Sequence, residues 1–379
     1  MPDWVSSVAD VLAAFGRELA QLTLSGPRAR ESWKASFAVV LALILSFLIF
    51  DVNDASWAAF GAFMVLRARV AETATRGFFR VIGTAAGGLL GFFLGGFTAN
   101  NAGGLLLAMM GIGFVSIFYF AVSQYSYAWM FFGFTGELVL SLTLGAPQTV
   151  TPFVVIRIGE ILTGVVACVV ISCLFNAIWP VDDAKPGPHP GPAGMPMWRG
   201  LFNEDWLEAH WLPLIHAARG AVALAVLFVF WRVIELSSFV DSAATSYMVL
   251  MVPGALIRQG KDSAMTNRGM QRLAGCTLGG AFALVALIFV KDYLQIWLLA
   301  LVAGVWIGAW VQNGKEGVSY AGSQFALVLL VTFVQGNGPP QTLLPAWQRF
   351  QGILVGLFIL GLVQWVWPLP TPKSSEQQA

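Results

Sequence analysis

The sequence predicts an all-α membrane protein with about twelve transmembrane helices, arranged as two parallel six-helix repeats. Composition is the first reason: of 379 residues, 57% are hydrophobic and 11% are charged, whereas a soluble chain carries about 25% charged residues. The second reason is that apolar residues come in runs, such as 37–50, 105–120 and 161–178. A helix needs roughly 17 to 25 residues to cross a bilayer, so these runs, with the small residues inside and beside them, predict membrane spans.

Residues 1–30 form the first expected element, an N-terminal amphipathic segment. Its apolar residues recur at helical spacing between Val8 and Leu22. Two placements fit this pattern: a helix lying on the membrane surface, and a cytosolic helix packed on the helical bundle. A signal peptide does not fit, because the segment starts acidic and is interrupted by Arg17 and Glu18.

Residues 31–180 are expected to form the first six-helix membrane repeat, because six apolar segments are separated by short polar or Gly/Pro turns. We expect its helices near 33–50, 55–70, 79–97, 103–121, 127–145 and 153–179. Residues 181–212 are rich in Pro and Gly and lack periodicity, which predicts a cytoplasmic linker with a short amphipathic piece at its end.

Residues 213–370 are expected to form the second six-helix membrane repeat, followed by a cytoplasmic tail at 371–379. The expected helices lie near 214–236, 241–257, 270–290, 293–311, 319–335 and 346–367. An even number of spans in each repeat would give both repeats the same orientation, related by a pseudo-twofold axis along the membrane normal.

Matched motifs indicate that the two repeats arose by duplication. TRGFFRVIGTAAGG at Thr75 is matched by NRGMQRLAGCTLGG at Asn267. Further matches follow in the same order and at a nearly constant offset: YAWMFFG with YAGSQFA, APQT with PPQT, RIGEILTG with RFQGILVG, and a closing Trp-Pro in each half. Collinear matches of this kind are typical of a tandem repeat.

The basic residues predict the orientation. Most Lys and Arg residues fall on one side of the expected spans, leaving only Arg232 and Lys291 opposite. Because Lys and Arg are enriched in cytoplasmic loops, both termini are expected in the cytoplasm. The duplicated Arg-Gly-x-x-Arg then lies where the third and ninth spans enter the membrane, and its arginines can snorkel to headgroups or form a substrate gate. These arginines are Arg76, Arg80, Arg268 and Arg272.

Glycines recur at four-residue steps in the third and ninth spans, as in Gly83, Gly87 and Gly91, and in Gly275 and Gly279. In lipid this spacing allows close approach of two helix backbones. A phosphate-binding glycine loop is not expected, because no strand precedes these segments.

The order of these motifs resembles the fusaric acid resistance family, the aromatic acid exporters of bacterial inner membranes, which are distantly related to plant malate channels. The resemblance covers residues 31–180 and 213–370. It implies a multi-pass inner-membrane protein that exports aromatic carboxylates or similar organic anions, driven by the proton gradient. It also implies a periplasmic adaptor or a homo-oligomer as partner, beside the lipid bilayer and the small organic anion.

Charged residues inside the spans are the candidate functional residues, because each costs on the order of 2.5 to 3.5 kcal/mol on insertion scales. Glu137 lies near the middle of the fifth expected span, where burial favours a neutral carboxyl group. It is therefore the first candidate for proton coupling, and Glu160 is the second. The alternative for Glu137 is a structural carboxyl group that forms a helix–helix hydrogen bond.

Arg157 and Glu160 are three residues apart and can pair within one helix. Arg157 recurs as Arg349, but Gly352 replaces Glu160, so the second arginine lacks an acid one turn away. Two related arginines suit the capture of a carboxylate by a bidentate fork, and tyrosines suit stacking on an aromatic ring. The substrate-binding candidates are Arg157, Arg349, Tyr127 and Tyr320.

Other function classes fit less well. An enzyme is not expected, because His189, His210 and His216 lie in or beside the linker, remote from the intramembrane carboxylates. For the same reason no cofactor or metal is expected, and no nucleic-acid partner. A passive organic-anion channel and a non-transporting membrane scaffold remain as alternatives to the exporter.

Overall fold

The structure is a computed structural model of the chain. It describes residues 7–50, 55–98, 100–145, 150–180, 203–234, 238–258, 263–290, 293–335 and 344–370. Most of the expected linker, residues 181–202, and the whole expected tail, residues 371–379, lie outside the described residues.

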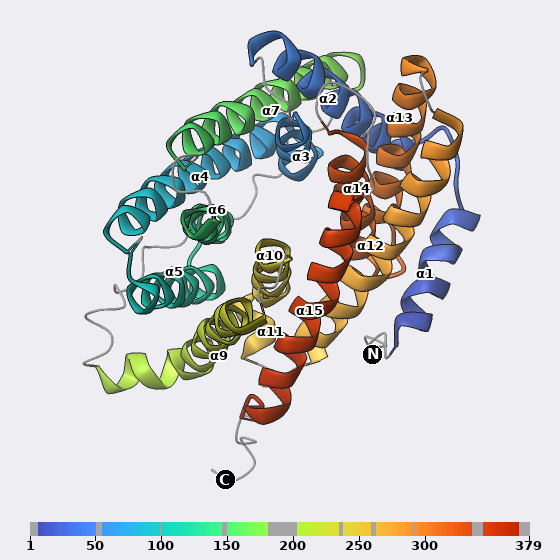
Figure 1. The fold of residues 1–379 in the computed structure, drawn as a ribbon. Coiled ribbons are helices and arrows are strands. Elements are labelled where there is room, and N and C mark those ends of the chain that lie inside the picture. The colour runs from blue at the N-terminus through green and yellow to red at the C-terminus, as the bar shows by residue number, and fades with distance from the viewer. Residues whose placement is uncertain are drawn as a thin grey trace, which may run out of the picture. The chain divides into compact units, whose positions relative to one another are not determined.

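The described residues form helices and no strand (Figure 1). Eight helices are long and apolar enough to cross a membrane: α2, α4, α5, α7, α9, α12, α13 and α15. The helices are α1 (Val8–Ala20), α2 (Pro27–Ile49), α3 (Ser56–Val65), α4 (Val70–Thr98), α5 (Ala102–Val122), α6 (Ser126–Gly145), α7 (Val150–Ile178), α9 (Glu204–Ile234), α10 (Phe239–Leu250), α11 (Gly254–Ile257), α12 (Ser263–Val290), α13 (Leu294–Gln312), α14 (Ser319–Phe333) and α15 (Leu344–Val366).

The chain divides into two compact units, and four of the five boundaries between them fall inside helices, namely α4, α7, α12 and α15. Unit 1 consists of Met1–Val81, Val155–Lys185 and Asn267–Phe350. Unit 2 consists of Ile82–Val154, Pro186–Thr266 and Gln351–Ala379. Each unit therefore draws on both halves of the sequence, and each is described separately below.

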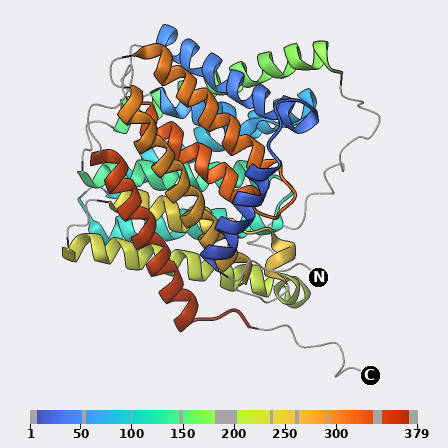
Figure 2. The ribbon, with the colours of Figure 1, turned by 90° about the vertical axis from the view of Figure 1, so that its right-hand side faces the viewer.

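Unit 1 is built around α13, which packs against α2 on one side and α14 on the other (Figure 2). The Ser36 hydroxyl of α2 donates a hydrogen bond to the Val302 carbonyl at 3.2 Å. Aromatic residues fill the core beside α13, where Trp306 and Trp310 stack with ring centroids 5.3 Å apart. These contacts place polar side chains in the first turns of α2 close to the end of α13.

Helix α1 belongs to unit 1 and packs on α13 and α14. Its apolar side buries Val11 and Phe15 in the core that contains Trp310. The Glu18 carboxylate, 1% exposed, forms an ion pair with Arg28 and accepts a hydrogen bond from the Glu316 backbone N–H at 2.6 Å. The packing on the bundle that one of the two expected placements requires is therefore found, and the position of α1 relative to the membrane surface stays a prediction.

Unit 2 is built around α5, which packs against α6 and α9. Its core contains Met109, Leu140, Leu227 and Phe239, all buried. Helix α9 begins at Glu204, inside the expected linker, because Trp206 is buried against Phe118 with ring centroids 5.8 Å apart.

Close backbone approach by glycines is confirmed in both units. In unit 2, a Cβ atom at Gly83 or Gly87 of α4 would collide with the carbonyl oxygens of Ala128 and Phe132 on α6. In unit 1, a Cβ atom at Gly275 or Gly279 of α12 would likewise collide with carbonyls on α14. Helices in lipid gain little free energy by burying apolar side chains against one another. Their packing depends instead on small residues that let two backbones approach closely.

Two expected spans are shorter than the sequence predicts. The helix expected at 55–70 ends at Val65, and the helix expected at 241–257 ends at Leu250. Both stop within the same tripeptide, Met-Val-Leu, at 64–66 and 248–250. The backbone becomes extended at Leu66, with ψ of 135°, whereas at Met251 (ψ 68°) it forms a tight turn in which the Val252 N–H donates to the Leu250 carbonyl at 2.7 Å. Apolar periodicity continues through each break, so it could not reveal where the helices end.

Candidate functional sites

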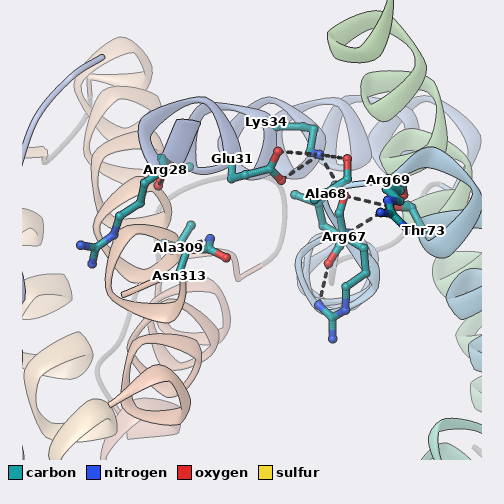
Figure 3. Close-up of polar contacts among 11 residues, drawn as sticks. Arg28, Glu31, Lys34, Arg67, Ala68, Arg69, Thr73, Ala309 and Asn313 are labelled. Atoms are coloured by element: carbon teal, nitrogen blue, oxygen red, sulfur yellow. Dashed lines mark hydrogen bonds and ion pairs between the residues drawn. The ribbon is translucent and has the colours of Figure 1, made fainter. Parts of the chain in front are cut away.

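Lys34 of α2 contacts the residues that directly follow the early end of α3 in unit 1, as Figure 3 shows. Its side chain is 2% exposed. The Lys34 ammonium group lies 2.8 Å from the Glu31 carboxylate and donates hydrogen bonds to the carbonyls of Arg67 at 2.9 Å and Ala68 at 3.1 Å. These carbonyls have lost their helical partners, so Lys34 satisfies backbone groups that lipid could not. We call Glu31, Lys34, Arg67 and Ala68 the Lys34 site.

A cavity of about 240 Å³ lies beside the Lys34 site and within unit 1. We call it the unit 1 cavity. It lies among the first turns of α2, the broken end of α3, the start of α4 and the end of α13. Its lining residues are Glu31, Ala35, Phe63, Leu66, Arg67, Ala68, Glu72, Ala309, Gln312 and Asn313.

The broken end of α10 in unit 2 has a related arrangement. His216 of α9 is fully buried, and its Nε2 lies 2.8 Å from the Leu250 carbonyl oxygen. Because a carbonyl oxygen only accepts, Nε2 carries the hydrogen. The expectation that His216 lies in or beside the linker is wrong, since α9 extends well before this residue.

Glu137 of α6 is the buried acid at the centre of unit 2. It is 3% exposed, and neither carboxylate oxygen has a hydrogen-bond partner among the described residues. Burying an unpaired carboxylate is far more expensive than burying the neutral acid. This environment therefore favours a carboxyl group that holds a proton. The predicted helix–helix hydrogen bond is not found in the described structure.

A narrow crevice separates Glu137 from α10. Tyr247 lines the same crevice and donates a long hydrogen bond to the Trp129 carbonyl at 3.4 Å. A Cβ atom at Gly133, one turn before Glu137, would collide with the Tyr247 hydroxyl and with Ser116. Sequence reasoning missed Tyr247 because a tyrosine in an apolar span carries no charge to mark it.

Arg157 and Glu160 of α7 form the buried ion pair that their spacing predicts. Nη1 of Arg157 lies 3.7 Å from Oε2 of Glu160, and both side chains are buried in unit 1. The Arg157 guanidinium also lies over the ring of Trp57, with Cζ 3.6 Å from the ring centroid. This cation–π contact was not predicted, because Trp57 lies on a different helix, α3.

The remaining candidates have separate surroundings. Tyr320 of α14 lies beneath the guanidinium of Arg268, 4.1 Å from Cζ to the ring centroid, in unit 1. Arg349 is half-buried in the part of α15 that belongs to unit 1. Tyr127 is in unit 2, with its ring edge-on to Phe131 at 4.9 Å. The structure thus brings two of the candidates, Arg157 and Glu160, together as an ion pair.

The second arginine of each duplicated motif does not snorkel. Arg80 is 1% exposed, with its guanidinium 4.9 Å from the ring centroid of Phe60. Arg272 is also buried, and its Nη1 donates to Oε1 of Gln324 at 2.6 Å. Both arginines lie within unit 1 and contact protein rather than headgroups, so the snorkelling expectation is wrong for them.

Comparison with known families is consistent with this helical architecture. The model of the fusaric acid resistance protein family matches residues 29–184, and that of fusaric acid resistance protein-like sequences matches residues 224–363. No curated protein and no solved structure matches the chain. The two matches fall on the two halves that the motifs delimit, and they include seven of the eight long apolar helices in whole or in large part, together with the C-terminal third of α9. The chain is therefore a multi-pass membrane protein that belongs to the fusaric acid resistance protein family.

Proposed function

We propose that the protein is a proton-coupled transporter that exports aromatic carboxylates or similar organic anions across a bacterial inner membrane. The observation that carries this proposal is the Glu137 carboxyl group, which is buried without a hydrogen-bond partner among the described residues. A buried acid that takes up a proton in one state and releases it in another can couple transport to a proton gradient.

The proposed architecture has twelve spans in two parallel repeats with both termini cytoplasmic. Support comes from the matching composition of the two units. Unit 1 contains α2, α3 and most of α7 from the first half and α12, α13 and α14 from the second. Unit 2 contains the complementary set. In unit 1 α2 packs on α13, and in unit 2 α9 packs on α5. Each pair joins the first helix of one proposed repeat to the fourth helix of the other.

The proposed substrate contacts remain those of the paired arginines and the tyrosines. Arg157 contacts Glu160 and Trp57, and Arg349 is the second proposed carboxylate-binding residue. Tyr127 and Tyr320 are proposed to contact the aromatic ring. A periplasmic adaptor or a second copy of the chain is the proposed partner.

Transport in proteoliposomes tests the coupling. We expect the wild-type protein to move 4-hydroxybenzoate faster when a pH gradient is imposed, and Glu137→Gln to lose this acceleration, because the amide keeps the shape but cannot exchange a proton. Glu208→Gln is the matched control, since Glu208 is an exposed acid of α9 in the same unit and should retain the acceleration.

Other outcomes separate the alternatives. Transport that is independent of the gradient in all three proteins would indicate a passive channel. Gradient-driven transport that persists in Glu137→Gln would assign coupling to another residue, with Glu160 the next candidate. Absence of transport for a panel of aromatic and aliphatic acids would indicate a scaffold.

A further inference from the structure

We propose that Tyr247 of α10 is a positioning residue for proton coupling, because its hydroxyl group donates a hydrogen bond to the Glu137 carboxylate when Glu137 is ionised. This inference rests on the proposed coupling at Glu137 and adds to it the partner that makes the ionised state accessible inside unit 2. Without such a donor, a carboxylate buried in this position would be too unfavourable to form in each transport cycle.

Glu137 and Tyr247 line the same crevice between α6 and α10. The crevice is too narrow to admit a water molecule. Tyr247 is fully buried, and Glu137 is 3% exposed. While the crevice is closed, a hydrogen-bond donor for the ionised carboxyl group must therefore come from the protein itself.

The geometry of α6 directs the two groups to the same turn. Side chains of an α-helix lean toward its N-terminus and cover the turn before their own Cα atom, so Glu137 covers the turn that contains Gly133. The Tyr247 hydroxyl group also lies at this turn, where a Cβ atom of Gly133 would collide with it. Because glycine has no side chain, nothing on this face of α6 stands between the Tyr247 hydroxyl group and the Glu137 carboxyl group.

Two other hydroxyl groups lie nearby, and both are already used within their own helices. Ser116 of α5, which lies beside Tyr247, donates to the Ile112 carbonyl at 2.6 Å. Ser141 lines the crevice and donates to the backbone carbonyl of Glu137 at 2.7 Å. Neither serine can donate to the carboxyl group without losing a short hydrogen bond.

The hydroxyl hydrogen of Tyr247 is held more weakly. It is donated to the Trp129 carbonyl at 3.4 Å, beyond the roughly 2.5 to 3.0 Å that is usual for an O–H···O hydrogen bond. Trp129 is four residues before Gly133 in α6, so its carbonyl also accepts the Gly133 N–H in the helical pattern. If the hydroxyl group turns to an ionised carboxylate, this long bond is exchanged for a charge-assisted bond, which is shorter and stronger.

The two protons have separate fates in the proposed step. Glu137 releases its proton to solvent water when the crevice opens during the transport cycle. Tyr247 keeps its own proton, and its hydroxyl group turns from the Trp129 carbonyl to the carboxylate, so that the crevice can close over the ionised acid. When Glu137 is protonated again, the hydroxyl group returns to Trp129.

Other titratable groups near α6 do not share this crevice. Helices α4, α5 and α10 pack on α6 within unit 2. The part of α4 in unit 2 has no titratable residue, and α5 has Tyr119, whose ring stacks on Trp129. Helix α10 has Asp241, which is not in the crevice lining, and Tyr247, which is. Among the described residues, Tyr247 is thus the one titratable group that lines the crevice with Glu137.

Infrared titration of the detergent-solubilised full chain tests the proposal. The difference between each protein and the same protein with Glu137→Gln isolates the C=O stretching band of protonated Glu137, and loss of this band with rising pH gives the midpoint of ionisation. Tyr247→Phe removes the hydroxyl group and keeps the ring. We expect the midpoint to move to higher pH by about one unit or more, because a hydrogen bond to a charged group changes proton affinity about tenfold or more.

Two further variants complete the test. Gly133→Ala adds a Cβ atom where the Tyr247 hydroxyl group lies, so it should move the midpoint in the same direction while the hydroxyl group stays in the chain. Tyr125→Phe is the matched control, because it makes the same change at an exposed tyrosine directly before α6 and should leave the midpoint unchanged. Thermal melting shows whether each variant is folded. If Gly133→Ala fails to fold, Tyr247→Phe, which loses only a long hydrogen bond, decides the matter.

A wild-type midpoint in Tyr247→Phe overturns the proposal, as does a shift to lower pH or a shift that Tyr125→Phe shares. A band that does not titrate in the wild-type protein also overturns it, because Glu137 would then never ionise in the folded chain. The proposed function fails separately. A shifted midpoint without gradient-driven transport supports the hydrogen bond and refutes proton coupling, whereas gradient-driven transport that needs Glu137, with an unshifted midpoint, refutes the role of Tyr247 alone.

Discussion

Glu137 in unit 2 and Glu160 in unit 1 are both acids buried in apolar helices, but their surroundings differ. Glu160 is 2% exposed and has Arg157 one turn away, with 3.7 Å between charged atoms. Glu137 is 3% exposed and has no hydrogen-bond partner among the described residues. A paired acid can remain ionised in a buried site, whereas an isolated acid is held neutral. The two acids are equally buried, and what distinguishes them is the cationic partner that Glu160 has and that Glu137 lacks among the described residues.

The largest effect on stability should follow from breaking the Arg157–Glu160 ion pair. Arg157→Ala leaves Glu160 buried without its guanidinium partner, and removing one member of a buried pair typically costs about 3 to 5 kcal/mol. We expect a loss of this size in the free energy of unfolding, measured by denaturant titration in detergent micelles. Replacing both members, as in Arg157→Met with Glu160→Leu, should restore most of it. A double variant as unstable as Arg157→Ala would show that the arginine acts through Trp57 instead.

An intermediate effect should appear in substrate affinity. Lys keeps the charge of Arg but loses the planar fork, so Arg349→Lys should weaken binding of 4-hydroxybenzoate by about 1.5 to 3 kcal/mol, the value of a hydrogen bond to a charged group. Arg157→Lys should weaken it less, because Glu160 and Trp57 already contact that guanidinium. Equal affinities for both variants and the wild type, with lowered melting temperatures, would make both arginines structural.

The smallest effect should be that of replacing Glu137 on the free energy of unfolding of the protein. Glu137→Gln replaces a neutral carboxyl group with a neutral amide of nearly the same shape, so we expect the free energy of unfolding to change by only about 1 kcal/mol. Thermal melting at pH 7 measures it, with Glu160→Gln as the comparison, because that change leaves Arg157 buried without its acid. A loss at Glu137 as large as that at Glu160 would mean that Glu137 is ionised and paired.

Much of the fold could be predicted from the sequence. Helices occupy each of the twelve expected segments, with two of them, α10 and α11, in the segment 241–257, because apolar runs and Gly/Pro turns are local signals. Eight of the helices are long and apolar enough to cross a membrane. The ends of α3 and α10 could not be predicted, since each break is stabilised by a side chain far away in the sequence, Lys34 for α3 and His216 for α10. The start of α9 depends in the same way on a contact between Trp206 and Phe118.

The candidate sites were predictable only where they are local. The Arg157–Glu160 pair follows from a spacing of three residues on one helix. The unit 1 cavity does not, because its lining comes from α2, α3, α4, α13 and the residues between them. Lys34 is one of the basic residues on the expected cytoplasmic side, and two sequence signals could mark it as more than that: the acid Glu31 three residues before it and the Met-Val-Leu tripeptide that both halves contain.

The packing of α1 has a consequence for how the protein is divided in the laboratory. The family match begins at residue 29, so a domain boundary taken from it would remove α1 and cut beside Arg28. Trp310 would lose the acceptor of its indole N–H, the Glu18 carbonyl at 2.9 Å, and the Glu316 N–H would lose the Glu18 carboxylate. An apolar surface that includes Trp306, Val318 and Phe325 would lose the Val11 and Phe15 side chains that pack on it. A shortened chain of this kind should aggregate during extraction from the membrane, and its failure would say nothing about the helices that follow.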